Sequence, residues 1–320
     1  MLPLVLMVLV LIDGAAASPT VVATGFAWAE NILCEPAESA ARNGTLWVSE
    51  STRGELWRVT WRENEGAAGQ GDWEQTLHYS RGADRVAGLA RDPGPGGGLY
   101  ALVQPEDAAP GKDGKNCVLM RIDRNRTDAA EAIATLPRKC LGDGLAFDNA
   151  TQTFFVANEG DFLPYNGKVY AIQKSTGAVT EIAQDGGPYT STDGASYDAA
   201  TGLLFVSEVY ASALLRVNVA KNTVEKIKAP DGVQGIDDFC VSEDDTNLIH
   251  ATSPLNGKVF RWNMSSDEVR VFGEGLQFPT SVRAGCLGLG MGGWFVTEGG
   301  GVEKDDIDRR VLWFPGDASE

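Results

Sequence analysis

Six copies of one short pattern run along the chain, and this repetition constrains the fold more than any other feature. Each copy consists of three β-rich runs separated by polar turns. Repeats of about 40–50 residues that are rich in short strands are typical of blades set around one axis. The sequence therefore predicts an all-β fold, a six-bladed β-propeller. The copies begin at Glu30-Asn31-Ile32, Ala87-Gly88-Leu89, Asp143-Gly144-Leu145, Asp193-Gly194-Ala195, Asp237-Asp238-Phe239 and Thr280-Ser281-Val282.

The last copy lacks a fourth, outer strand, because the chain stops soon after Phe314. At the other end, Thr20–Phe26 resembles Val269–Phe278, which passes from a β-rich run through glycine to an aromatic residue. We expect the N-terminal strand to complete the last blade and close the ring, which removes exposed sheet edges. Since no linker divides the chain, residues 18–320 are predicted to form a single domain.

The N-terminal residues predict export. The apolar run Leu2–Ile12 is too short to span a bilayer, and small residues follow it at Ala15–Ser18. We therefore expect residues 1–17 to be a signal peptide and the protein to be secreted, with no membrane span. Four acceptor sequons agree with a secreted glycoprotein. They begin at Asn43, Asn125, Asn149 and Asn263.

The five cysteines cannot all pair with one another. Cys117 opens one predicted strand and Cys140 closes the next, so this pair is the favoured disulfide. Cys34, Cys240 and Cys286 lie on or near inner strands and are interpreted as small buried thiols.

The formal net charge of −17 argues against nucleic acid and anionic membranes as partners, because such a surface repels both. A solvated acidic surface explains most of this charge, and a cation site explains part of it. The sequence leaves the oligomeric state open.

Four of the six leading positions are acidic: Glu30, Asp143, Asp193 and Asp237. If they start inner strands, they gather at one mouth of the central channel, where carboxylates repel one another unless a cation or protons compensate them. Oxygen ligands favour a hard ion such as Ca²⁺ or Mg²⁺. A plain turn is the alternative explanation of each Asp-Gly pair. Four acidic residues in register weaken it.

The same mouth is expected to receive the ends of the second strands and the longest loops. There we place a substrate pocket with apolar walls. Its predicted members are Glu208, Tyr210, Phe162, Tyr165 and Thr280. A Gly-x-Ser-x-Gly elbow is absent from the sequence, and the two histidines, His78 and His250, fall at structural positions of predicted strands.

Several short segments of the sequence resemble the motifs of one known family. They are Trp28-Ala29-Glu30-Asn31-Ile32, Gly142–Asp148, Thr192-Asp193-Gly194, Gly235–Phe239 and Pro279-Thr280-Ser281. Nearly the whole mature chain is similar to the senescence-marker-protein/gluconolactonase/luciferin-regenerating-enzyme family of six-bladed propellers. The resemblance implies one divalent cation bound by Glu30, Asp193 and Asp237, Asp143 near the substrate, and hydrolysis of a lactone or related ester.

The chain departs from the family pattern at two places. Asp193 stands where the family has asparagine, which adds a negative charge. The third-blade motif Arg-x-Asn-Asp-Gly is replaced by Cys140–Gly144, without the arginine and asparagine thought to hold a sugar lactone. The cation site is thus retained, whereas the usual sugar-acid substrate is in question.

Three hypotheses follow. The first is a secreted lactonase or esterase in which one divalent cation polarises the ester and Asp237 or Asp143 accepts a proton from water. Ca²⁺ is the favoured ion, with Mg²⁺, Mn²⁺ or Zn²⁺ as alternatives, and the partner is a small-molecule lactone or ester. The second is a non-catalytic ligand-binding propeller with a structural Ca²⁺. The third is a strictosidine-synthase-like enzyme that uses a glutamate base without metal.

Overall fold

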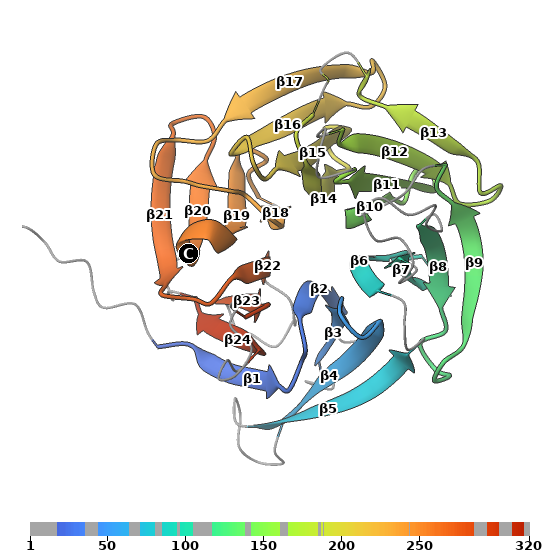
Figure 1. Ribbon diagram of the computed structural model, residues 1–320, viewed down its shortest axis with the longest axis vertical. Helices are drawn as coiled ribbons and strands as arrows, with labels where there is room; N and C mark the ends of the chain where they lie inside the picture. The colour runs from blue at the N-terminus through green and yellow to red at the C-terminus, as the bar shows by residue number, and fades with distance from the viewer. Residues whose placement is uncertain are drawn as a thin grey trace, which may run out of the picture.

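The fold is a ring of six antiparallel sheets, each with four strands (Figure 1). The six-bladed propeller predicted from the repeats is confirmed. A helix long and apolar enough to cross a membrane is absent from the described residues. The computed structural model describes residues 18–35, 44–63, 71–80, 85–94, 97–104, 117–137, 142–160, 166–184, 187, 189–242, 244–284, 293–300 and 309–316.

The blades are named here in chain order, each from its inner to its outer strand. Blade 1 contains β2 (Ala29–Glu35), β3 (Gly44–Glu50), β4 (Glu55–Glu63) and β5 (Gly71–Ser80). Blade 2 contains β6 (Arg85–Arg91), β7 (Leu99–Gln104), β8 (Val118–Ile122) and β9 (Ala130–Thr135). Blade 3 contains β10 (Gly142–Asp148), β11 (Thr153–Asn158), β12 (Lys168–Gln173) and β13 (Val179–Ile182).

The remaining blades follow the same order. Blade 4 contains β14 (Thr192–Asp198), β15 (Leu203–Glu208), β16 (Ala213–Asn218) and β17 (Thr223–Lys228). Blade 5 contains β18 (Phe239–Val241), β19 (Leu248–Ser253), β20 (Lys258–Asn263) and β21 (Glu268–Glu274). Blade 6 contains β22 (Pro279–Ala284), β23 (Gly293–Glu298), β24 (Arg310–Pro315) and β1 (Thr20–Thr24).

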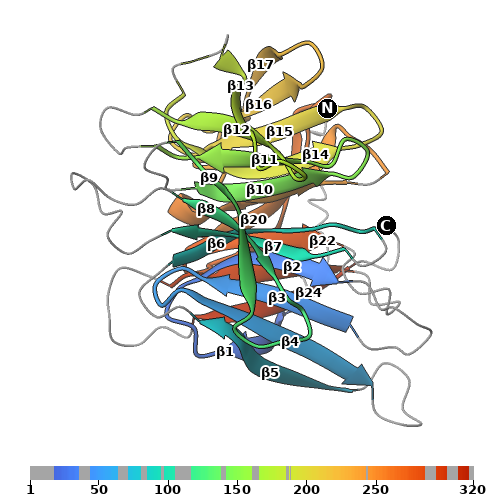
Figure 2. The same cartoon turned by 90° about the vertical axis from the view of Figure 1, so that its right-hand side faces the viewer.

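The ring is closed by two strands from opposite ends of the sequence. β1 pairs antiparallel with β24, so that Thr20 lies opposite Trp313 and Thr24 lies opposite Arg310. The N-terminal strand thus supplies the outer strand of blade 6, as the missing last strand predicts. Figures 1 and 2 both place blade 1 and blade 4 on opposite sides of the ring.

The second strand of blade 3, β11, is apolar from Phe154 to Ala157 because both of its faces are buried. On β11, Phe154 and Val156 pack in a cluster with side chains of blade 2, such as Leu119. Phe155 and Ala157 pack in a different cluster with side chains of blade 4. Since successive residues of a strand point to opposite faces, a continuous apolar run fills two interfaces between blades.

A break in strand register marks three of the four leading acidic positions, those of Glu30, Asp143 and Asp193. The pairing of β10 with β11 shifts between Gly142 and Leu145, and that of β14 with β15 shifts between Thr192 and Ala195. β2 shifts in the same way between Ala29 and Ile32. A β-bulge redirects side chains from the regular pleat. The repeated sequence motif therefore forms a bulge at the start of each of these three inner strands.

The glycine of each Asp-Gly pair is required by the neighbouring inner strand. A Cβ at Gly144 would overlap the carbonyl oxygen of Asp193 and lie 2.5 Å from the amide nitrogen of Ala195. A Cβ at Gly194 would lie 2.7 Å from the carbonyl oxygen of Asp237. Neither glycine has a positive φ. The turn explanation of Asp-Gly is therefore wrong at these two positions: close approach of inner strands selects glycine.

Hydroxyl groups near the ends of the second strands join adjacent inner strands. Ser207 Oγ accepts from the Gly194 amide at 2.8 Å and donates to the Asp237 carbonyl at 2.6 Å. Thr297 Oγ1 accepts from the Ser281 amide at 2.9 Å and donates to the Glu30 carbonyl at 2.9 Å. These hydroxyls hold the backbone of two predicted cation ligands.

Replacing Thr297 with valine should destabilise the ring. The change keeps the shape of the side chain but leaves the buried Glu30 carbonyl and Ser281 amide without this partner, which costs about 1–3 kcal/mol. Urea unfolding of the variant measures the loss. Thr223→Val on the exposed strand β17 is the matched control, and an equal effect of the two substitutions would contradict this role.

The cysteines correct part of the sequence analysis. Cys34 and Cys117 are both disulfide-bonded. The interpretation of Cys34 as a thiol is therefore wrong. Cys140, the predicted partner of Cys117, lies outside the described residues, as does Cys286. Cys240 is half-buried on β18.

The predicted glycosylation sites have different surroundings. Asn125 and Asn149 are exposed turn residues. Asn263 is half-buried at the end of β20, and its side-chain oxygen accepts from the amides of Ser265 and Ser266. Asn43 and the predicted signal peptide, residues 1–17, lie outside the described residues.

Candidate metal centre

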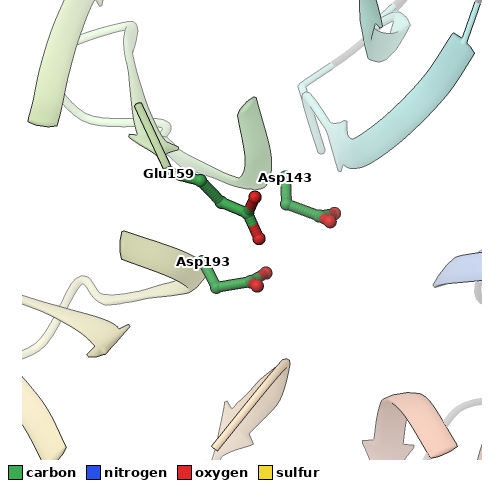
Figure 3. A group of neighbouring side chains, drawn as sticks. All are labelled: Asp143, Glu159 and Asp193. Carbon is green, nitrogen blue, oxygen red and sulfur yellow. The ribbon is translucent and has the colours of Figure 1, made fainter. Parts of the chain in front are cut away.

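Three carboxylates from blades 3 and 4 meet near the centre of the ring. Asp143 lies on the bulge of β10, Asp193 lies on the bulge of β14, and Glu159 directly follows β11. One oxygen from each lies within 4.8 Å of the others. Figure 3 shows the Glu159 carboxylate beside both aspartates, with all three side chains directed into the same space.

Glu30 and Asp237 extend this group to blades 1 and 5. Both residues are buried. Burial, followed by the charges of Asp143 and Asp237, raises the pKa of Glu30 well above its usual value. Burial, followed by the charges of Asp143 and Asp238, raises the pKa of Asp237 well above its usual value. These charges act between the blades, but among the described residues the carboxylates whose oxygens all lie within 4.8 Å of one another are Asp143, Glu159 and Asp193, not the predicted set of Glu30, Asp193 and Asp237.

Asp193 is the member of the group whose carboxylate has an unpartnered buried oxygen among the described residues. Its side chain is buried, and within the described part of the chain its Oδ1 has no hydrogen-bond partner. Burial, then the charges of Asp237 and Asp143, raises the pKa of this carboxyl well above its usual value. Buried polar oxygens nearly always have partners. A cluster of carboxylates with an unpartnered buried oxygen fits a hard divalent cation.

Polar neighbours orient two other members. Asn31 Nδ2 donates to Asp143 Oδ1 at 2.6 Å, and Ser51 Oγ donates to Glu30 Oε2 at 3.1 Å. The pKa of Asp143 rises to about 7, because it is buried and lies near Glu159. Arg85 at the start of β6 is a nearby positive charge that opposes the rise in the pKa of Asp143.

Asp238, which adjoins Asp237, has a different role. Its Oδ2 accepts from Ser281 Oγ at 2.6 Å and lies 2.7 Å from Arg283 Nη1. Its charge is compensated within the interface between blades 5 and 6.

The structure places the predicted pocket residues in different surroundings. Glu208 is fully buried, accepts from the Thr190 amide at 2.9 Å and forms an ion pair with Lys226 at 2.6 Å. Thr280 is buried and donates to the Ala29 carbonyl at 2.8 Å. These contacts account for both residues as parts of the ring. Tyr210 is 48% exposed on the turn between β15 and β16. Phe162 and Tyr165 lie outside the described residues.

Sequence reasoning missed Glu159, Arg85 and Asn31. Glu159 comes directly after Asn158, a strand-end residue that the repeat pattern did indicate. Asn31 is the second residue of the bulge in blade 1. Arg85 lies two residues before the uncharged leading position of blade 2, where the pattern offered no signal.

The raised pKa values predict how stability depends on pH in the metal-free protein. A carboxyl with a higher pKa in the folded state still binds a proton there when the unfolded chain has released it. The free energy of unfolding should therefore fall as pH rises from about 4, the usual value, toward the raised values. We expect the metal-free protein to melt roughly 5 °C lower at pH 8 than at pH 5. Calorimetry measures this difference, and a higher melting temperature at pH 8 would contradict it.

Comparisons with known proteins support the fold. No family model matches the chain, and no curated protein matches it. Regucalcin from Agrobacterium tumefaciens, described as a calcium-binding protein, superposes with a TM-score of 0.64 at 14% identity, covering 93% of each chain. Luciferin-regenerating enzyme gives 0.63 at 12% identity, covering 93% of this chain and 96% of that one.

A gluconolactonase from Xanthomonas campestris gives a TM-score of 0.62 at 12% identity, covering 92% of this chain and 88% of that one. The resemblance predicted from the motifs is thus confirmed at the level of the fold. Identities this low carry the fold alone, so the chemistry has to be argued from the residues of this chain.

Proposed function

We propose that the protein is a secreted hydrolase that needs a divalent cation to open a lactone or cleave a related ester in its channel. The observation that carries this proposal is the buried Asp193 carboxylate, whose Oδ1 has no partner among the described residues while Asp143 and Glu159 lie beside it. Similarity to a gluconolactonase and to a calcium-binding regucalcin supports the choice of reaction and ion.

Glu30, Asp193 and Asp237 would hold the cation, and Ca²⁺ suits this all-oxygen set best. When bound, such an ion polarises an ester carbonyl and stabilises the negative charge that develops on its oxygen. Zn²⁺ is less suited, because it more usually has histidine or cysteine ligands.

Asp143 is our first candidate for the general base, with Asp237 as the second. Asn31 Nδ2 holds Asp143 Oδ1, which leaves the other oxygen available to a water molecule. A pKa of about 7, produced by burial and by Glu159, allows the carboxyl to accept and release a proton near neutral pH.

Removal of the cation tests the proposal. Protein treated with excess chelator should lose hydrolysis of lactones and aryl esters, and Ca²⁺ should restore it. A panel of lactones of different ring size, assayed with Ca²⁺, Mg²⁺, Mn²⁺ and Zn²⁺ in turn, identifies substrate and ion. Full activity in excess chelator would refute the mechanism.

The second candidate is a non-catalytic binding propeller in which the ion ties the blades together. It is favoured by the origin of the carboxylates, since Glu30 and Asp193 come from opposite blades. It predicts that chelation lowers the melting temperature and that none of the lactones and esters in the panel is hydrolysed.

Secretion and glycosylation belong to the same proposal. Expression in a eukaryotic host should yield a mature chain that begins near residue 18, with glycans on the exposed Asn125 and Asn149. N-terminal sequencing and the mass change after glycosidase treatment test both points.

A further inference from the structure

The channel carboxylates hold more negative charge than one divalent cation compensates. Five residues form the group: Glu30, Asp143, Glu159, Asp193 and Asp237. Arg85 is the positive side chain that acts on three of them, Glu30, Asp143 and Glu159. One bound divalent cation would leave two negative charges uncompensated, and a second would bring the group to neutrality. Buried charges persist only when they are compensated.

The positions of the carboxylates divide the group into two parts. Asp143, Glu159 and Asp193 form a compact triad on blades 3 and 4. Glu30 and Asp237 come from blades 1 and 5, and the charge of Asp237 acts on Glu30. Asp193 belongs to both parts, because one of its oxygens lies within 4.8 Å of oxygens of Asp143 and Glu159, and the charge of Asp237 also acts on its carboxyl.

A buried carboxylate with an unpartnered oxygen is suited to bridge two ions. Asp193 is 4% exposed, and the part of the chain that the structure describes offers its Oδ1 no hydrogen bond. Figure 3 shows this side chain directed into the same space as Asp143, with the Glu159 carboxylate beside it. Carboxylates commonly bind Ca²⁺ through either one or both oxygens.

We propose that the channel binds two divalent cations, the first between Glu30, Asp193 and Asp237 and the second in the triad of Asp143, Glu159 and Asp193. This inference rests on the proposed function for the first ion and adds a distinct second site. Pairs of cations about 3.5–4 Å apart are known to clamp attacking and leaving oxygens in hydrolytic sites. Because Asn31 Nδ2 already holds Asp143 Oδ1, Asp143 would ligate this ion through its other oxygen, and Asp237, the second candidate for the general base, would then accept the proton.

Calcium stoichiometry tests the inference without any substrate. The metal-free full chain is titrated with CaCl₂ by calorimetry, and elemental analysis is done after gel filtration in Ca²⁺. We expect two Ca²⁺ per chain for the unmodified protein and one for Glu159→Gln. Glu30→Gln should also keep one ion, now in the triad. The control Glu181→Gln, on the outer strand β13 beside Lys168, should keep both.

The outcomes separate this inference from the proposed function. One Ca²⁺ per unmodified chain overturns the second site and leaves the proposed function standing, whereas none overturns both. Two ions that persist in both Glu159→Gln and Asp143→Asn place the second ion elsewhere and also overturn the inference. Circular dichroism shows whether each variant is folded, and the unmodified protein decides the stoichiometry even if one variant is not.

Discussion

Alanine at position 193 is expected to abolish cation binding and hydrolysis while the ring stays folded. Asp193 contributes the buried unpartnered oxygen and lies between the other carboxylates, so its loss removes the central ligand. We expect Ca²⁺ affinity and kcat/KM to fall by at least about 100-fold. Calorimetric titration measures the affinity, and the lactone that responds in the panel measures the activity.

The stability of this variant gives an independent check. In metal-free buffer at pH 8, Asp193→Ala removes a buried carboxylate that Asp237 and Asp143 repel, so the variant should not melt below the unmodified protein. Asp198→Asn is the matched control, because Asp198 lies at the far end of the same strand and its carboxylate accepts from Ala200 and Thr201 in the turn. Undiminished activity of Asp193→Ala would exclude the proposed site.

The second large effect concerns the backbone beneath the site. Gly144→Ala would place a methyl group against the Asp193 carbonyl and 2.5 Å from the Ala195 amide, both of them backbone atoms of the next inner strand. Since the overlap is with backbone atoms and not with the end of a flexible side chain, we expect a loss of at least about 3 kcal/mol in the free energy of unfolding. Cation binding should weaken as well, because the displaced strand carries Asp193.

Gly187→Ala is the control for this substitution. A Cβ at Gly187 would be 3.8 Å from its nearest neighbours, which is ordinary van der Waals contact. We expect a change within about 0.5 kcal/mol. Chemical unfolding of both variants measures the contrast, and a Gly144→Ala protein as stable as the control would show that the inner strands are not tightly packed.

Much of the fold was predictable because it follows from local periodicity. The apolar run of β11 predicts a strand buried on both faces, and the structure shows Phe154 and Phe155 in the interfaces with blades 2 and 4. The missing outer strand of the last repeat predicts the pairing of β1 with β24. Repeats also place Glu30, Asp143, Asp193 and Asp237 at equivalent positions, which brings them to one end of the channel.

The predictions that were wrong concern contacts between residues that are distant in sequence. Cys34 is disulfide-bonded, although a cysteine on an inner strand carries no sign of a partner in the sequence alone. Glu208 ends its strand like a channel residue, yet Lys226 and Thr190 bind its carboxylate within blade 4. The strand-end pattern indicated Glu208, whereas Glu159, which does join the site, lies one residue beyond the end of its strand.

The sequence by itself determined the number of blades, their strand order and the leading carboxylates, because a repeated pattern of strands and turns is local information. Only the tertiary structure decided which oxygens converge. Bulges on separate strands set the directions of Asp143 and Asp193, and the end of β11 brings Glu159 between them. Arg283 compensates Asp238 and leaves Asp237 with the channel group. The charges around the site thus come from blades that are far apart in the sequence. Their side chains come close enough to interact only when the ring is closed.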